Sequence, residues 1–147
     1  MRIVSRLVDL QSTDTLDFIE ITDKVQAELT ASGIKEGLVN IQSLHTTMAV
    51  VVNEAEPLLI SDMKKLLEEL APRNREYAHD DFKARTVNLC KAECANGHSH
   101  NKALHLPTSV MLNILDGKLQ LGTWQRVFAI ELDRPRPRKV ALQIIGG

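Results

Sequence analysis

Apolar and polar residues alternate along several short segments of the chain, which is the pattern of strands that bury one face. Residues 3–10 and 16–21 are two such segments, and the polar residues 11–14 between them suit a turn, so we predict a hairpin. Residues 37–44 alternate as well. Residues 46–52 are rich in β-branched side chains, which favours a strand that is largely buried.

Two other segments place apolar residues three and four positions apart, which predicts amphipathic helices. The first covers residues 22–31, where Thr22 or Asp23 can act as the N-cap. Gly33 then suits the left-handed residue that commonly ends a helix. The second helix begins at Pro57, a favourable first helical residue, and continues to the next proline in the chain.

The carboxyl half combines a long polar region with closing strands. We expect residues 72–100 to be mostly loop with one helical turn, because polar residues, Pro and Gly interrupt any period. Asp116 and Gly117 predict a tight hairpin turn. The predicted closing strands are residues 109–114, 118–123, 126–133 and 138–145. The order of predicted elements is early strands, two helices and then a run of late strands. This order indicates one α+β domain over residues 1–147 and not a doubly wound parallel sheet, because that fold requires strands and helices to alternate regularly.

Charge and composition restrict the partners and the cellular compartment that we expect for this chain. Lys plus Arg number 18 and Asp plus Glu 19, so the chain lacks the basic field that attracts nucleic acid, and we expect no nucleic-acid partner. The apolar runs are too short to span a membrane and the first residues lack the apolar core of a signal peptide, so we expect a cytoplasmic protein. Cys90 and Cys94 should be reduced thiols, and their spacing is not that of a structural zinc site.

All five histidines lie between residues 45 and 105, and imidazole is a common metal ligand that titrates near neutral pH. His45 stands before two threonines at a junction between predicted strands. His98 and His100 would share a face in an extended segment but not on a helix, and Lys102 adds a positive charge for a phosphate. For each histidine alone, an ordinary hydrogen-bonded role is the alternative.

Other candidates have equally ordinary alternatives. Glu54 would lie a strand length from His45, on the order of 25 Å, unless the strand bends or another protomer intervenes. Asp62 falls at the edge of the apolar stripe of its helix, either solvated or deliberately buried. Trp124, the only tryptophan, either packs in the core or meets a ligand. The basic, proline-rich residues 134–138 are adequately explained as a solvated turn.

Several phrases occur together in one order along the chain: ITDKV, SGIKEGLV, HTT, NE, YAHD, SHNKA and GKLQLGTWQ. With them the chain resembles the YjbQ-like family, also described as secondary thiamine-phosphate synthase enzymes, from about Asp17 to Gly146. The resemblance implies an α+β sandwich of two helices and about seven mostly antiparallel strands, which assembles as a homotrimer with sites near the subunit boundaries. The sequence departs from the family pattern at His105, Pro107 and Asn113, which leaves the loop shape near the site open.

The matching positions supply the site hypotheses. They are His45, Thr46, Thr47, Asn53, Glu54, Asp62, His79, His100, Lys102, Gly122, Thr123, Trp124 and Gln125. In an enzyme acting on a small phosphorylated molecule, the three histidines would bind a divalent metal such as zinc or a phosphate. Glu54 or Asp62 would act as general acid or base, Lys102 would neutralise substrate charge, and the remaining positions would bind substrate.

The resemblance adds thiamine-phosphate synthase activity as a secondary reaction of such an enzyme. One alternative is a trimeric binding protein that holds a metal or an anionic metabolite without turnover. Another is that the polar motifs mainly hydrogen-bond the subunits of a trimer to one another.

Overall fold

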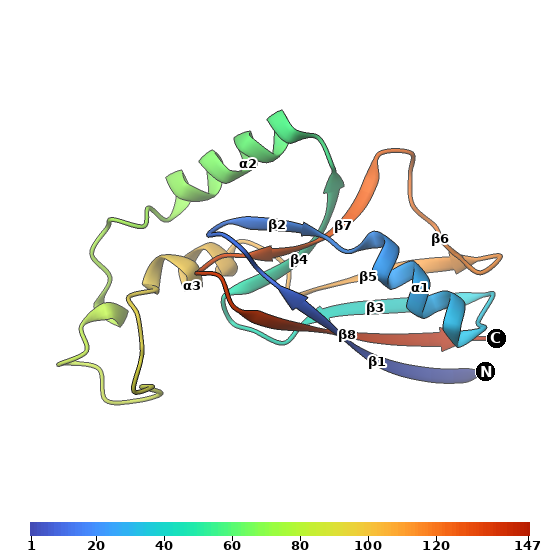
Figure 1. Cartoon of the computed structure of the whole chain (residues 1–147), viewed down its shortest axis with the longest axis horizontal. Helices are drawn as coiled ribbons and strands as arrows, with labels where there is room; N and C mark the ends of the chain where they lie inside the picture. Colours follow the sequence, from blue (N-terminus) through green and yellow to red (C-terminus); the bar gives the residue numbers. More distant parts are fainter.

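Two antiparallel sheets and three α-helices make up the chain, and the computed structural model describes all residues 1–147 (Figure 1). The strands are β1 (Arg2–Gln11), β2 (Asp17–Glu20), β3 (Gly37–Ser43), β4 (Met48–Glu54), β5 (Ser109–Leu115), β6 (Lys118–Leu119), β7 (Gln125–Glu131) and β8 (Pro137–Gly146). The helices are α1 (Thr22–Ser32), α2 (Pro57–Leu70) and α3 (Gly97–Leu104), with one 3-10 turn, η1 (Ala78–Asp80). The predicted α+β class is confirmed. The resemblance implied one helix and one strand fewer.

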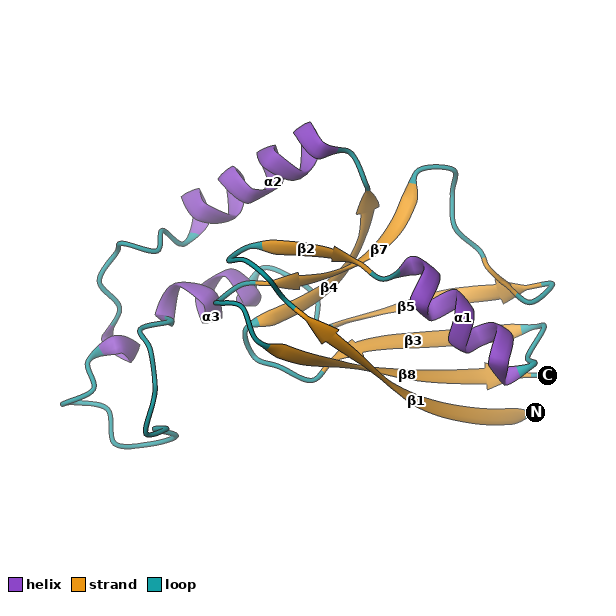
Figure 2. Cartoon of the chain, viewed as in Figure 1, coloured by secondary structure: helices purple, strands orange, loops and turns teal.

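The larger sheet has the strand order β1-β8-β3-β5-β6 and the smaller one the order β2-β7-β4 (Figure 2). Apolar side chains of both sheets and of α1 form the main core, which includes Val25 of α1, Val50 and Val127 of the smaller sheet, and Ile41 and Leu142 of the larger one. The two sheets therefore pack face to face, and α1 closes one end of the core.

The two sheets have different burial patterns because they are covered differently. In β8, buried and more exposed residues alternate, since only one face of the larger sheet meets the core. In β7, the residues from Val127 to Glu131 are all buried. A second cluster, which includes Phe128, Ile130 and Leu67 of α2, covers the other face of the smaller sheet. The expectation of a largely buried strand at residues 46–52 is confirmed for its first half, Met48 to Val50.

The predicted hairpin at the amino end does not form. β1 pairs along its whole length with β8, and β2 pairs with β7 in the other sheet. Residues 12–16 carry the chain from one sheet to the other, and Leu16 adopts a left-handed φ of 53° at the end of this connection. The alternation of apolar and polar residues predicts a strand but does not identify the strand with which it pairs. Because β8 has ten residues, β1 can pair with more residues of β8 than of β2.

The ends of α1 confirm one expectation and correct another. Gly33 adopts the left-handed conformation that ends the helix, with φ of 70°. At the other end the N-cap is Ile21, which offers no capping side chain. The hydroxyl of Thr22 accepts a hydrogen bond from the Val127 N–H at 2.8 Å, so it joins the start of α1 to β7 rather than capping the helix.

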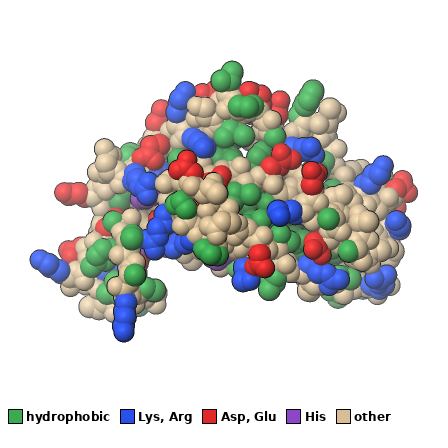
Figure 3. Space-filling model, in the orientation of Figure 1, with side chains coloured by type: hydrophobic (Ala, Val, Ile, Leu, Met, Phe, Trp, Pro, Cys, Tyr) green, Lys and Arg blue, Asp and Glu red, His purple; other side chains and the backbone are tan.

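Helix α2 has the predicted bounds, and the Glu56 carboxylate caps it by accepting bonds from the N–H groups of Leu58 and Leu59. Its apolar side is only partly covered, since Leu67 is its one buried residue, while Leu58 is 75% and Leu66 54% exposed. Apolar side chains are visible on the surface at the top of the molecule, where α2 lies (Figures 1 and 3). None of the helices combines the length and apolar character that a membrane crossing requires.

The region after α2 is more ordered than its sequence indicates. It contains the one expected helical turn, η1, but its last residues begin α3, which places His98 and His100 on a helix. The tight turn at Asp116 and Gly117 is confirmed, with positive φ at both residues. The predicted strand 118–123 is paired only at Lys118–Leu119, and the closing strands are divided between the two sheets.

Candidate functional site

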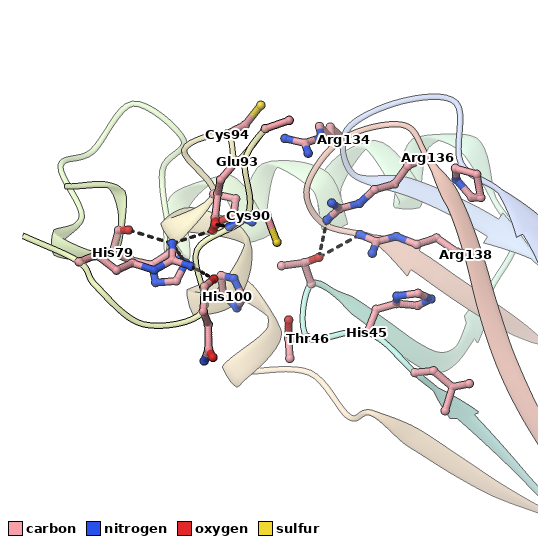
Figure 4. A pocket seen from close by; sticks show the side chains of 17 residues that line it. His45, Thr46, His79, Cys90, Glu93, Cys94, His100, Arg134, Arg136 and Arg138 are labelled. Carbon is pink, nitrogen blue, oxygen red and sulfur yellow. Dashed lines mark hydrogen bonds and ion pairs between the residues drawn. The ribbon is translucent and has the colours of Figure 1, made fainter. Parts of the chain in front are cut away.

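A cavity of about 650 Å³ opens between the sheets and the loop region that follows α2 (Figure 4). One wall consists of the β3–β4 connection, with His45, Thr46 and Thr47, and of the end of the β7–β8 connection with the start of β8, within residues 134–138. The other wall consists of residues 85–96 together with His79 and His100. Basic side chains gather where this projecting region joins the body of the molecule (Figure 3). We call this cavity the arginine pocket.

Three arginines line the first wall: Arg134 and Arg136 from the β7–β8 connection, and Arg138 from the start of β8. Arg138 is only 4% exposed and makes hydrogen bonds from Nε and Nη2 to the carboxylate of Glu131. The Nη2 groups of Arg138 and Arg136 both donate to the hydroxyl of Thr47, at 2.9 and 3.1 Å. The interpretation of residues 134–138 as a solvated turn is therefore wrong, because their guanidinium groups turn into the pocket.

Two buried carboxylates hold this arginine wall in place. Asp133 pairs with Arg136 at 2.7 Å. Glu131 is 0% exposed and accepts further hydrogen bonds from the Ser12 hydroxyl and the Asp133 N–H. Burial raises the pKa of Glu131, but the bonds from Arg138, then from Asp133, then the charge of Arg138 outweigh burial and hold the pKa below its ordinary value. Glu131 is therefore an ionised carboxylate at neutral pH.

Two guanidinium N–H groups in this wall have no partner. They are Nη1 of Arg134 and Nε of Arg136, and both atoms are buried. Buried donors in folded proteins are nearly always paired, and each unpaired one costs free energy. Both arginines line the pocket, and a carboxylate or phosphate is the kind of partner that such donors bind, because hydrogen bonds between guanidinium and these anions are among the strongest in proteins.

The second wall carries a pair of imidazoles. The rings of His79 and His100 meet edge to face with their centroids 4.7 Å apart. Arg85 Nη1 lies 3.1 Å from His79 Nε2, and because an arginine can only donate, this nitrogen is the acceptor and the ring proton is on Nδ1. Burial, then the charge of His79, lower the pKa of His100. The lowered pKa favours the neutral form of the His100 ring, which can accept a proton.

His45 lines the same pocket from the strand side. Its Nε2 accepts a hydrogen bond from the Lys139 N–H at 2.9 Å, so this nitrogen is engaged by the backbone of β8. Burial, then the charge of Arg138, lower the pKa of His45. Folding thus places His45, His79 and His100 around one cavity, but only the rings of His79 and His100 contact each other, and no three histidine, cysteine or acidic side chains of the chain form a metal-ligand group.

The remaining predicted site residues lie elsewhere in the chain. Lys102 is fully buried outside the pocket, where its ammonium contacts the Ala71 carbonyl, His98 Nδ1 and Glu68. Asn53 and Glu54 are exposed at the end of β4. Asp62 is solvated on α2 beside Lys65. Gly122, Thr123 and Gln125 line a separate groove against α1, and Trp124 is 71% exposed rather than packed in the core.

The sequence did carry a signal for the arginine wall. In an extended segment, residues two apart face the same side, so Arg134, Arg136 and Arg138 can share a face, as can Glu131 and Asp133. The same alternation does not hold for His98 and His100, because they lie on helix α3, where residues two apart do not share a face. The charge pattern alone does not distinguish a solvated turn from a pocket wall, because burial depends on distant segments.

These observations define a class of protein: an α+β sandwich with an arginine-lined pocket at the end of its two sheets. The sequence profile of the family described as "UPF0047 protein YjbQ-like" matches residues 6–147, and the chain belongs to this family. It is 33% identical to a UPF0047 protein of Methanothermobacter thermautotrophicus over 99% of this chain and 94% of that one. It is 35% identical to a UPF0047 protein of Archaeoglobus fulgidus over 92% and 97% of the two chains.

Solved structures show the same fold. A YbjQ-like protein of unknown function from Sulfolobus solfataricus superposes with a TM-score of 0.88 at 29% identity, over 99% of both chains. A hypothetical protein from Aeropyrum pernix superposes with a TM-score of 0.83 at 32% identity, over the full length of both chains. The family identification made from the sequence motifs is confirmed.

Replacing Glu131 by Gln should lower the free energy of unfolding at neutral pH by about 3 kcal/mol, because it leaves the buried charge of Arg138 unbalanced. The pKa of Glu131 is lower in the folded protein than in the unfolded chain. Its contribution to the free energy of unfolding is therefore complete above the unfolded-state pKa of about 4.3, and it is lost as the pH falls through the folded-state pKa. Urea unfolding between about pH 7 and pH 3 should therefore show the two proteins converging at the acidic end.

The matched control is Glu28→Gln, which removes one carboxylate from an exposed pair with Arg6 and should change stability by less than about 1 kcal/mol. A difference between wild type and Glu131→Gln that stays constant with pH would contradict the role assigned to Glu131.

Proposed function

We propose that the chain binds a small phosphorylated molecule in the arginine pocket and acts on it as an enzyme. The observation that carries the proposal is the pair of buried, unpartnered N–H groups on Arg134 and Arg136. Both belong to a wall whose charges are fixed in position by buried carboxylates, so little reorganisation is needed when an anion binds. Glu93 is the only acidic residue among those lining the pocket, and Arg85 already pairs with it at 2.7 Å.

The two walls support different chemical roles. The arginines and Thr47 would hold a phosphate or diphosphate group and stabilise the negative charge that develops when such a group leaves. His79 and His100 face it from the other wall and would donate or accept the proton. Coupling a pyrimidine diphosphate to a thiazole phosphate, the secondary activity implied by the family resemblance, releases diphosphate and so would use both walls.

The proposal changes the roles given to several candidates. Lys102 would position α3 rather than neutralise substrate, because its ammonium is fully occupied inside the chain. Glu54, Asp62 and residues 122–125 could take part only if a second copy brings them to the pocket of the first. We propose a homotrimer for this reason, and the exposed leucines of α2 support such an assembly, since large apolar patches usually mark interaction surfaces.

A binding protein without turnover is the second candidate. It is favoured by one observation: the pocket offers no unpaired carboxylate that could serve as a general base. In this version a divalent metal such as zinc, or an anionic metabolite, occupies the pocket. A metal would use the neighbouring rings of His79 and His100 together with ligands from outside this chain.

Phosphate and diphosphate should raise the melting temperature of the wild-type protein, because a ligand that binds only the native state stabilises it. Arg134→Gln removes a free donor without breaking any ion pair and should weaken binding about tenfold, measured by titration calorimetry. The control Arg126→Gln removes the same charge from a distant exposed pair with Glu20 and should bind like wild type. Equal affinities for all three proteins would overturn the assignment of the pocket.

Catalysis should depend on the imidazole pair. If the chain forms thiamine phosphate from the pyrimidine diphosphate and the thiazole phosphate, His79→Ala and His100→Ala should each reduce kcat by roughly 100-fold or more while diphosphate still binds. His105→Ala, a change at an exposed residue outside the pocket, is the control. Stabilisation by diphosphate with no product from the wild-type protein would favour the binding protein instead.

The assembly can be measured separately by light scattering, where the wild-type protein should have three times the mass of one chain. Leu66→Glu introduces a charge on the exposed apolar side of α2 and should shift the protein towards the monomer with its circular dichroism unchanged. Lys65→Glu, the exposed neighbour, should leave the mass unchanged. A wild-type protein with the mass of a single chain would exclude the trimer.

A further inference from the structure

Two cysteines lie in the wall of the arginine pocket and have no part in the proposed reaction. Cys90 and Cys94 are both exposed free thiols, and both line the cavity from the loop between η1 and α3. In Figure 4 the sulfur of Cys90 points inward, towards the side where Thr46 and the arginines are drawn, while the sulfur of Cys94 points away from it. The two thiols thus share one loop but have different positions relative to the pocket.

The loop backbone keeps the two cysteines close. The Glu93 N–H donates to the Cys90 carbonyl at 3.2 Å, and the Cys90 N–H donates to the Glu93 carboxylate at 3.0 Å. A turn of this kind brings the Cα atoms of Cys90 and Glu93 to within about 7 Å, and Cys94 is the next residue along the chain. Both thiols are therefore carried by one short turn, and their disulfide requires Cα atoms roughly 4.4–6.8 Å apart.

The pocket favours negatively charged reagents. Four arginines line it: Arg85, Arg136 and Arg138 are paired with Glu93, Asp133 and Glu131, whereas Arg134 has no carboxylate partner, so the lining carries one unbalanced positive charge. A cleft lined mainly by one sign of charge raises the local concentration of ions of the opposite sign. A neutral reagent of similar size gains nothing from this field, so charge should determine which reagents reach Cys90.

We propose that Cys90 and Cys94 form a dithiol modification site that reacts with the disulfide of an anionic low-molecular-weight thiol. This inference rests on the proposed function only in its use of the arginines to attract an anion. The thiolate of Cys90 attacks one sulfur of the small disulfide, a mixed disulfide forms on Cys90, and one thiolate leaves. The thiolate of Cys94 then attacks the sulfur of Cys90 and expels the second.

The electrons balance between the protein and the reagent. The two cysteines lose two electrons and two protons as their disulfide forms, and the small disulfide takes up both and becomes two thiols. Cys90 reacts first because its sulfur faces the arginines, and Cys94 resolves the intermediate because it is the neighbouring thiol on the same loop.

The test compares an anionic with a neutral disulfide on the reduced protein, with oxidised glutathione and hydroxyethyl disulfide as the two probes. Peptide mass spectrometry should find a Cys90–Cys94 disulfide with both. The second readout is the rate of reaction with the anionic probe divided by the rate with the neutral probe. This ratio should be about ten times higher for the protein than for a free peptide of residues 88–96. In Arg134→Gln most of this excess should disappear, while Cys94→Ser should stop at the mixed disulfide on Cys90.

Equal rate ratios for protein and peptide, a mixed disulfide confined to Cys94, or only disulfides between chains would overturn the inference. The proposed function is judged on a different measurement, the stabilisation of reduced wild-type protein by phosphate. Phosphate binding without charge-selective thiol exchange would therefore remove this inference alone, whereas a protein that binds no phosphate would remove the proposed function.

Discussion

The buried ion pair between Glu131 and Arg138 is the interaction on which the rest of the site depends. Glu131 ends β7 in the smaller sheet, and Arg138 lies in β8 of the larger sheet, so the pair joins the two layers where the core gives way to the pocket. Both side chains are almost fully removed from solvent. Breaking such a pair typically costs about 3–5 kcal/mol, because the remaining charge has no water to stabilise it. Its geometry is therefore tightly held.

The groups next to this pair have partners within the chain. Arg138 and Arg136 share the Thr47 hydroxyl, which connects the β3–β4 turn to the β7–β8 connection. Asp133 holds Arg136 in turn. What remains without a partner points to function, since a wall this well satisfied still leaves donors on Arg134 and Arg136 unpaired. The imidazoles of His79 and His100 line the opposite wall of the same pocket.

Local features of the chain could be predicted, and features that depend on distant segments could not. The bounds of α2, the glycine that ends α1 and the tight turn at Asp116 follow from neighbouring residues, and all three are confirmed. The pairing of β1 with β8 was missed because a pattern of alternation is equally compatible with any strand partner. For the same reason the motifs located three histidines of one pocket but could not show that Lys102 is enclosed elsewhere.

The sequence by itself determined the family and the α+β class, because periodicity, turn residues and ordered motifs are properties of neighbouring positions. Only the tertiary structure decided which polar residues meet. The arginines at 134–138 became a pocket wall, rather than a solvated turn, because Glu131, Asp133 and Thr47 bury and orient them. Burial and charge pairing are set by segments far apart in the chain, and no local pattern encodes them.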